Sequence, residues 1–330
     1  MARLFTEEDV DKNYLKDVVI SVLGYGNQGT AQSANLRDSG CKVVIGNSRD
    51  SAFDKAIKDG FETYSVAEAV SKAAIHLLLL PDETMPDIFE KDILPNLHQG
   101  DAIVVSSGYN VMYKFLKHPE WVDLLMVAPR MIGTGVRNGY LDKKGFPSLV
   151  SVEQDYTGLA FKKLLALSHA VGTIKGGAFE SSCYEETLCD LFNEHFGYVY
   201  ALQRAYELLV EAGASPEAAM LEFWASGEEM ELARVHMTHG LFHQLELHSE
   251  TSQYGQEITS VLSKEDEERE RDRLRGIITR IKDGSFAIEW KKEQENNCKN
   301  WKQVHEANKN SDLSIREETL LRTLGVLERN

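Results

Sequence analysis

Apolar residues in the first half of the chain form short continuous runs that are separated by glycine-rich or polar segments. Such runs are typical of parallel strands that are buried on both faces of a sheet. The run at 18–23, a helical pattern at 30–39 and a second run at 42–46 together predict a βαβ unit. Similar runs predict further strands of an N-terminal doubly wound α/β sheet of the Rossmann type at 74–80, 102–106 and 124–128.

The pattern changes near residue 180, beyond which apolar residues recur at helical spacing. Helices are predicted over 196–212, from 215 to beyond 232, and over 265–282. We therefore predict a dinucleotide-binding domain at 1–180 and an all-helical domain at 181–330.

A glycine-rich segment lies between the first predicted strand and its helix. Its G-x-G-x-x-G spacing lets the backbone approach a pyrophosphate at a helix N-terminus, and in this context the motif predicts a dinucleotide site. The candidate cofactor contacts in this segment are Gly24, Tyr25, Gly26, Asn27, Gln28 and Gly29.

The residues after the second predicted strand indicate which dinucleotide binds. An acidic residue directly at the strand end would bind the ribose hydroxyls of NAD, whereas Ser48, Arg49 and Ser51 offer donors and a positive charge that suit a 2′-phosphate. Asp50 complicates this interpretation unless its side chain points to solvent. We expect NADP(H), with further contacts at the cofactor edge from Asp82, Glu83, Thr84 and Gly133.

Asp190 and Glu194 are the most informative acidic residues. They lie four positions apart on a predicted helix and therefore share one face, which Glu186 extends by one turn. Facing carboxylates repel unless a charge offsets them, and a hard divalent cation is the usual partner. A solvated acidic face is the alternative. The upstream dinucleotide motif favours a metal-assisted, nicotinamide-dependent enzyme.

Charge and composition narrow the expected partners to a small-molecule substrate. The net charge of −16 argues against a nucleic acid or an anionic membrane surface, and no apolar run reaches the length of a membrane span. The four cysteines show no paired spacing, so reduced thiols in a cytoplasm are expected.

Taken together, these motifs resemble those of ketol-acid reductoisomerase, in its short class with a single helical domain. The resemblance runs nearly end to end and rests on the segments 23–29, 36–40, 80–83, 126–129, 185–194, 209–213, 249–255 and 284–290. It implies two magnesium ions that hold a 2-acetolactate-type substrate, an alkyl shift, and reduction by NADPH. It also implies a knotted helical domain, and a homodimer or larger homo-oligomer with shared active sites.

The resemblance also implies roles for individual residues. Asp190 and Glu194 match the family's first metal pair, and Ser249 matches its substrate-binding serine. Glu222 matches the first glutamate of a second acidic pair, whereas Glu228 matches the other only if two residues are inserted. A divalent metal other than magnesium stays possible.

Two expected catalytic positions depart from the family. Ser107 stands where the family has a histidine, and a serine cannot exchange protons as an imidazole does near neutral pH. Arg130 replaces a lysine; it keeps the charge with a different geometry and is expected to pair with a substrate carboxylate or oxyanion. We expect catalytic roles for Ser107, Arg130 and Glu194.

Three histidines have no counterpart in the family. His236, His239 and His243 would share a helical face if Gly240 does not break the helix. A histidine-rich surface, a changed metal, and a bound substrate anion all remain open.

Three functions follow from these patterns. The preferred one is a divergent NADP(H)- and metal-dependent reductase of another 2-oxo acid, ketol or imine, because Asp190 and Glu194 are kept while the family's histidine and lysine are lost. The alternatives are an authentic ketol-acid reductoisomerase acting on 2-acetolactate in branched-chain amino-acid biosynthesis, and a non-catalytic cofactor-binding homologue.

Overall fold

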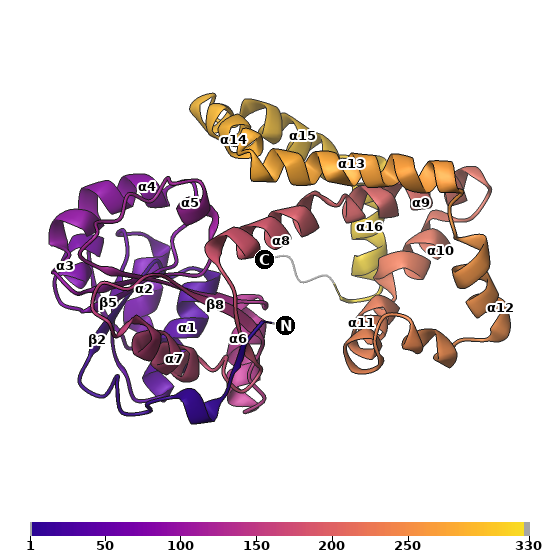
Figure 1. Cartoon of the computed structure of the whole chain (residues 1–330). Coiled ribbons are helices and arrows are strands. Elements are labelled where there is room, and N and C mark those ends of the chain that lie inside the picture. The colour runs from indigo at the N-terminus through magenta and orange to yellow at the C-terminus, as the bar shows by residue number, and fades with distance from the viewer. Residues whose placement is uncertain (1, 327–330) are drawn as a thin grey trace. The chain divides into compact units, whose positions relative to one another are not determined.

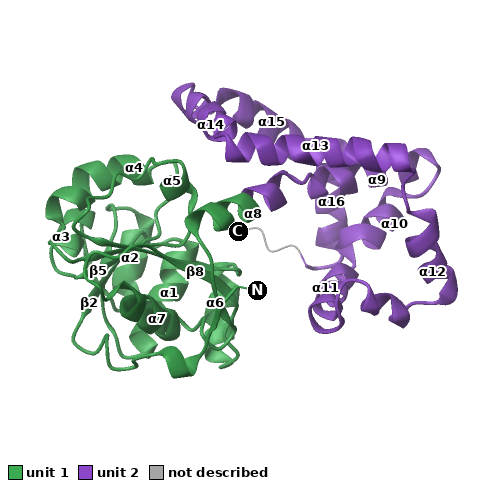
Figure 2. Ribbon diagram, viewed as in Figure 1, with its two compact units in different colours: residues 1–190 green, residues 191–330 purple. Residues whose placement is uncertain are grey.

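The computed structural model describes residues 2–326 and divides into two compact units, Met1–Asp190 and Leu191–Asn330 (Figures 1 and 2). The division falls within helix α8 (Cys183–His195), and the predicted boundary after residue 180 precedes that helix. No helix in the described part of the chain is both long and apolar enough to cross a membrane.

The first unit is built on a nine-stranded sheet in the order β1-β9-β8-β7-β6-β5-β2-β3-β4. The strands from β7 to β4 in this order are mutually parallel, which confirms the Rossmann-type fold, while β8 runs antiparallel to β7 and β1 antiparallel to β9. The strands are β1 (Leu4–Phe5), β2 (Val19–Leu23), β3 (Lys42–Gly46), β4 (Glu62–Tyr64), β5 (Ile75–Leu78), β6 (Ala102–Val105), β7 (Asp123–Pro129), β8 (Ser148–Gln154) and β9 (Ala178–Glu180).

Helices cover both faces of this sheet, and each face has its own apolar core. Ile20 and Val22 of β2 pack with residues of the helices α1 and α7, whereas Leu23 packs on the opposite face with residues of α3 and α4. This alternation follows from the two-residue period of a strand. The helices of this unit that precede α8 are α1 (Asn27–Asp38), α2 (Ser51–Lys58), α3 (Val66–Val70), α4 (Met85–Ile88), α5 (Tyr109–Met112), α6 (Gly133–Leu141) and α7 (Ala160–Val171).

The second unit contains only helices among its described residues, as predicted. Its main helices are α9 (Tyr198–Glu211), α10 (Pro216–Met220), α11 (Glu228–His239), α12 (Glu250–Tyr254), α13 (Lys264–Lys282), α14 (Ser285–Glu295), α15 (Lys299–Lys309) and α16 (Asp312–Thr323).

Two glycines correct the sequence-based prediction for this unit. The helix expected to run from 215 beyond 232 is interrupted at Gly227, whose φ of +85° is a left-handed conformation that separates the π-helical turn Leu221–Ala225 from α11. Helix α11 ends at His239 because Gly240 has φ +90°. His243 therefore lies in a separate 3₁₀ turn and does not share a continuous helical face with His236 and His239.

Candidate functional site

The glycine loop between β2 and α1 is closely packed at two of its three glycines. A Cβ atom at Gly29 would lie 2.0 Å from the carbonyl oxygen of Gly24, and one at Gly24 would lie 2.5 Å from the carbonyl oxygen of Leu79. Gly26, the N-cap of α1, has open space where its Cβ would be. Gly24 and Gly29 thus allow the turn to form, and Gly26 leaves open space in front of the helix N-terminus, a place where anions bind in other proteins.

The side chains of the other loop residues bind to the protein itself. The Tyr25 side chain is buried and its hydroxyl donates to Asp59 at 2.9 Å, while its backbone amide donates to the Asn47 side chain at 3.1 Å. Burial, assisted by this contact with Asp59, raises the pKa of Tyr25.

The start of α1 is also joined to the turn that precedes α6. The Asn27 side chain accepts from the Gly133 amide at 2.6 Å, and Gln28 donates to the Met131 carbonyl at 2.9 Å. Three of the predicted cofactor contacts therefore lie together at the start of α1, namely Asn27, Gln28 and Gly133.

The two charged residues after β3 that bear on the choice between NAD(H) and NADP(H) have different surroundings. Asp50 caps α2 by accepting from the amides of Ala52 and Phe53, and it also accepts from the Ser48 hydroxyl at 2.8 Å. The Ser48 hydrogen bond is the largest cause of the lowered pKa of Asp50. Asp50 is thus engaged locally, whereas Arg49 is exposed with its guanidinium 5.7 Å from the ring centre of Phe53.

Polar residues meet at the carboxyl ends of the neighbouring strands β5, β6 and β7, the edge at which such sheets bind ligands. Arg130 donates to Glu186 at 2.7 Å and, through its other terminal nitrogen, to Asp190 at 3.0 Å. Glu186 also accepts from the Gly108 amide at 2.8 Å. We call Asp82, Ser107, Arg130, Glu186 and Asp190 the strand-end cluster.

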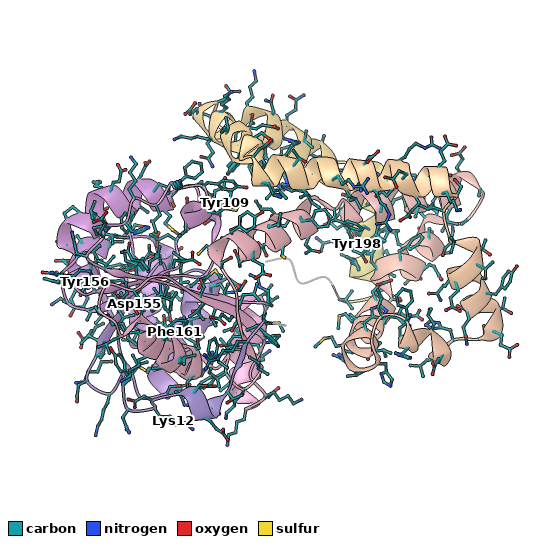
Figure 3. All side chains as sticks on the ribbon, in the orientation of Figure 1. Lys12, Tyr109, Asp155, Tyr156, Phe161 and Tyr198 are labelled. Carbon is teal, nitrogen blue, oxygen red and sulfur yellow. The ribbon has the colours of Figure 1, made fainter. Side chains whose placement is uncertain are left out.

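The turn that carries Ser107 packs tightly against the start of α8. A Cβ atom at Gly108 would lie 2.3 Å from the carbonyl oxygen of Cys183, so glycine is needed for this approach. Tyr109 follows Gly108 and begins α5 (Figure 3). Its side chain is buried. The close packing brings the Glu186 side chain under the turn.

Two carboxyl groups of the strand-end cluster have raised pKa values. Burial is the main cause of the raised pKa of Glu186, and it outweighs the opposing effects of the Gly108 amide and Arg130. Burial, followed by the charges of Glu186 and Glu83, raises the pKa of Asp82 to about 6, although hydrogen bonds with Asn110 and Ser107 act in the opposite direction. Such perturbed groups are typical of functional sites.

Asp190 and Glu194 lie on α8, as predicted, and their carboxylate oxygens suit a hard cation. The part of the chain that the structure describes contains no group of three or more His, Cys, Asp or Glu side chains arranged to hold a metal. The remaining predicted ligands belong to the second unit, with Glu222 in the π-helical turn and Glu228 at the start of α11. Ser249 caps α12 by accepting from the Ser252 amide.

Sequence reasoning missed the link between Arg130 and the acidic face of α8, although Glu186 was placed on that face. It also missed a buried array in which Ser21 contacts His76 at 2.8 Å and His76 contacts Asp101 at 3.2 Å. The array has the order of a nucleophilic triad. Ser21 is fully buried in the sheet and cannot meet a substrate, so we assign the array to stabilisation of the sheet.

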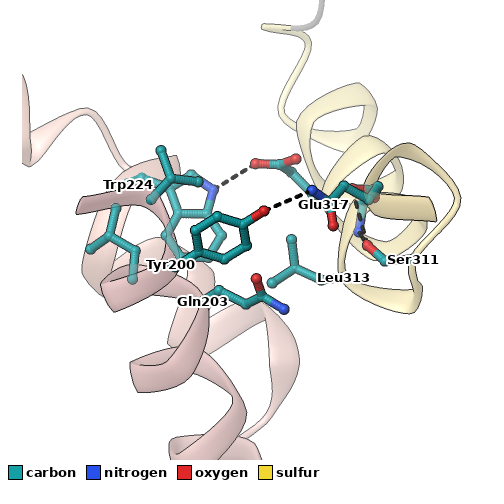
Figure 4. A pocket seen from close by; sticks show the side chains of 10 residues that line it. Tyr200, Gln203, Trp224, Ser311, Leu313 and Glu317 are labelled. Carbon is teal, nitrogen blue, oxygen red and sulfur yellow. Dashed lines mark hydrogen bonds between the residues drawn. The ribbon is translucent and has the colours of Figure 1, made fainter. Parts of the chain in front are cut away.

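A cavity of about 370 Å³ lies within the second unit (Figure 4). Trp224 donates to Glu317 at 2.7 Å across it, and Asn308 donates to the Tyr200 hydroxyl at 3.2 Å. These four polar residues are thus paired across the cavity, and none is a residue for which the sequence predicts chemistry.

Known proteins similar to this chain cover almost all of it. Residues 14–177 match the family model "Acetohydroxy acid isomeroreductase, NADPH-binding domain", and residues 184–324 match "Ketol-acid reductoisomerase, C-terminal domain". The chain is 43% identical to the putative ketol-acid reductoisomerase 3 of Saccharolobus solfataricus over 87% of this chain and 88% of that protein. It is 36% identical to the ketol-acid reductoisomerase (NADP(+)) of Pyrobaculum calidifontis, over 94% and 95%.

The fold is also similar to that of a solved structure, which is described as an NADH-preferring ketol-acid reductoisomerase from an uncultured archaeon. The two chains are 33% identical with a TM-score of 0.89, and the similarity covers 99% of this chain and 100% of the other.

Proposed function

This chain belongs to the ketol-acid reductoisomerase family of NADP-dependent oxidoreductases, and we propose that it is a divergent member that reduces a 2-oxo acid, ketol or imine without the alkyl shift. The observation that carries this proposal is the strand-end cluster. It holds Ser107 where the family has a histidine, and an arginine that both Glu186 and Asp190 already engage.

The alkyl shift requires a group that removes the proton of the substrate hydroxyl and later returns it. A serine hydroxyl and an arginine guanidinium do not exchange protons near neutral pH as an imidazole does, so neither Ser107 nor Arg130 replaces the histidine in this role. Asp82 has a pKa of about 6 and a hydrogen bond with Ser107, so it can supply the single proton that a reduction consumes.

Reduction makes smaller demands on the protein. A bound nicotinamide would supply a hydride to the substrate carbon, and the carbonyl oxygen or imine nitrogen would take up a proton. Asp82 and Ser107 would hold that proton near the reacting atom, and Gly26 would seat the pyrophosphate. A divalent cation held by Asp190 and Glu194 of α8, with Glu222 of the partner subunit as a further candidate ligand, would act as a Lewis acid on the substrate oxygen.

The test is NADPH oxidation with Mg²⁺, comparing 2-acetolactate with its isomerised product, 3-hydroxy-3-methyl-2-oxobutyrate. We expect turnover of the second compound or of other oxo acids and imines, and none of 2-acetolactate. Turnover of both would overturn the proposal in favour of an authentic ketol-acid reductoisomerase, the activity that the name of the Pyrobaculum relative states.

Variants at Ser107 locate the cause. If the missing imidazole blocks the shift, Ser107→His should gain turnover of 2-acetolactate, whereas the matched variant Ser107→Asn, of similar size without a titratable group, should not.

A further inference from the structure

The guanidinium of Arg130 connects two carboxylates that differ in their surroundings. The Glu186 side chain is 1% exposed, whereas that of Asp190 is 46% exposed and that of Arg130 is 32% exposed. All three residues belong to the first compact unit. The cation thus has one buried contact and one contact open to solvent.

The two contacts differ in strength for this reason. A charge pair that is shielded from water and supported by a further hydrogen bond, here from the Gly108 amide, is costly to break. A pair open to solvent is weak, because water screens the attraction between its charges. Arg130 can therefore release Asp190 while it remains bound to Glu186.

Asp190 is also a ligand expected for a divalent cation. Its Oδ1 atom accepts from Arg130 at 3.0 Å, and a metal ion near this carboxylate would meet the positive charge of the guanidinium. The same oxygen cannot serve both cations at full strength.

We propose that Arg130 competes with a divalent cation for Asp190. The metal then binds only when the salt bridge between Arg130 and Asp190 breaks, while the salt bridge between Arg130 and Glu186 is kept. This inference rests on the proposed metal-dependent function. It makes Arg130 a positioning residue that weakens metal binding, a role that a lysine would not have, because a single ammonium lacks the planar fork that spans both carboxylates.

The experiment measures Mn²⁺ binding to the full-length chain with NADPH present, by the electron paramagnetic resonance signal of free Mn²⁺. Arg130→Lys keeps the positive charge and removes the fork, and we expect it to bind Mn²⁺ about fivefold more tightly than the unmodified chain. Arg130→Met removes the charge as well and should bind more tightly still. Thermal melting and NADPH binding check that each variant is folded.

Two further variants serve as controls. Arg137 of α6 is also forked, between Asn35 and Asp38 of α1, so Arg137→Lys repeats the chemical change elsewhere in the same unit and should leave the Mn²⁺ affinity unchanged. Asp190→Asn should abolish the tight binding gained in Arg130→Lys, which places the ion at Asp190.

The outcomes separate the inference from the function on which it rests. Equal Mn²⁺ affinity of the unmodified chain and Arg130→Lys would overturn the competition while leaving metal dependence in place. A higher Mn²⁺ affinity in Arg130→Met but not in Arg130→Lys would show that the positive charge alone weakens metal binding. That result would overturn the bridging role of the guanidinium. Absence of Mn²⁺ binding in every form would overturn both the inference and the proposed metal-dependent function.

Discussion

Asp82 shows how the neighbours of one residue set its protonation. Its folded pKa of about 6 lies above the ordinary value of 3.8, mainly because it is buried and faces other carboxylates. Between these two pH values the folded chain holds a proton that the unfolded chain has released. The contribution of Asp82 to stability therefore falls as pH rises from about 4 to about 6, and its full destabilising effect is present above pH 6.

Replacing the carboxyl by an amide removes this proton linkage. We expect Asp82→Asn to lose less thermal stability than the unmodified chain when pH is raised from 4.5 to 6.5, because the amide oxygen still accepts from Asn110. Melting temperatures at both pH values measure the effect. Asp17→Asn, at an exposed residue, is the control; identical pH profiles for all three chains would show that Asp82 does not titrate in this range.

Arg49 is the residue from which we expect selectivity for NADPH. Its side chain is exposed, while the nearby Asp50 is occupied in capping α2. A charge-assisted hydrogen bond to a 2′-phosphate contributes about 1.5–3 kcal/mol, so Arg49→Gln should weaken NADPH binding by about tenfold or more. The affinity for NADH should not change.

Fluorescence titration with both cofactors, with Lys58→Gln as the control for lost charge, tests this prediction. Tighter binding of NADH than of NADPH by the unmodified chain would contradict it, and would match the NADH preference ascribed to the solved archaeal structure.

The elements were predictable where short-range patterns determine them. The run at 18–23, the glycine loop and the run at 42–46 predict β2, α1 and β3 closely, because buried parallel strands and a loop of this spacing leave a local signal. Strands β1, β4, β8 and β9 were missed. Three of them are short, at two or three residues, and β8 mixes polar with apolar positions.

The candidate site was predictable only in part, for a physical reason. Helical spacing places Glu186 and Asp190 on one face of α8, but it does not show what faces them. Arg130 reaches that face from the end of a strand, 56 and 60 positions away in the chain. The sequence therefore predicted that a positive charge offsets these carboxylates and assigned it to a metal, whereas in the structure an arginine contacts them.

Alanine substitutions in the glycine loop can test its role in folding separately from its role in cofactor binding. Gly29→Ala would place a methyl group 2.0 Å from the Gly24 carbonyl, so we expect it to destabilise the fold by at least about 2 kcal/mol. Gly26→Ala meets no atom within 4 Å and should fold normally, but its methyl group would occupy the space for the pyrophosphate and weaken NADPH binding. Urea unfolding and NADPH titration of both variants measure the two effects. Unchanged NADPH affinity in Gly26→Ala would show that the pyrophosphate does not bind at this loop.

At the scale of the whole molecule, the second unit exposes many large apolar side chains. One of its core clusters consists of Tyr206, Ala219, Met220 and Leu320 with a few partly buried neighbours. Exposed apolar residues of this unit include Val199, Leu208, Met230, Met237, Leu241, Phe242, Leu247, Ile258 and Val261. Exposure of so much apolar surface is typical of a chain that associates with a partner.

We therefore predict that the chain is a homodimer or a larger homo-oligomer. Sedimentation velocity at micromolar concentration should give at least twice the monomer mass of 37.1 kDa. Met237 and Phe242 are 81% and 75% exposed, so replacing both by serine should shift the equilibrium toward the monomer without lowering the stability of a monomer core that they do not enter. Leu141→Ser, at a residue of the first unit that is 56% exposed, is the matched control and should leave the mass unchanged. A monomer mass for the unmodified chain at this concentration would show that its apolar surface does not bind a second copy, and each active site would then have to form within one chain.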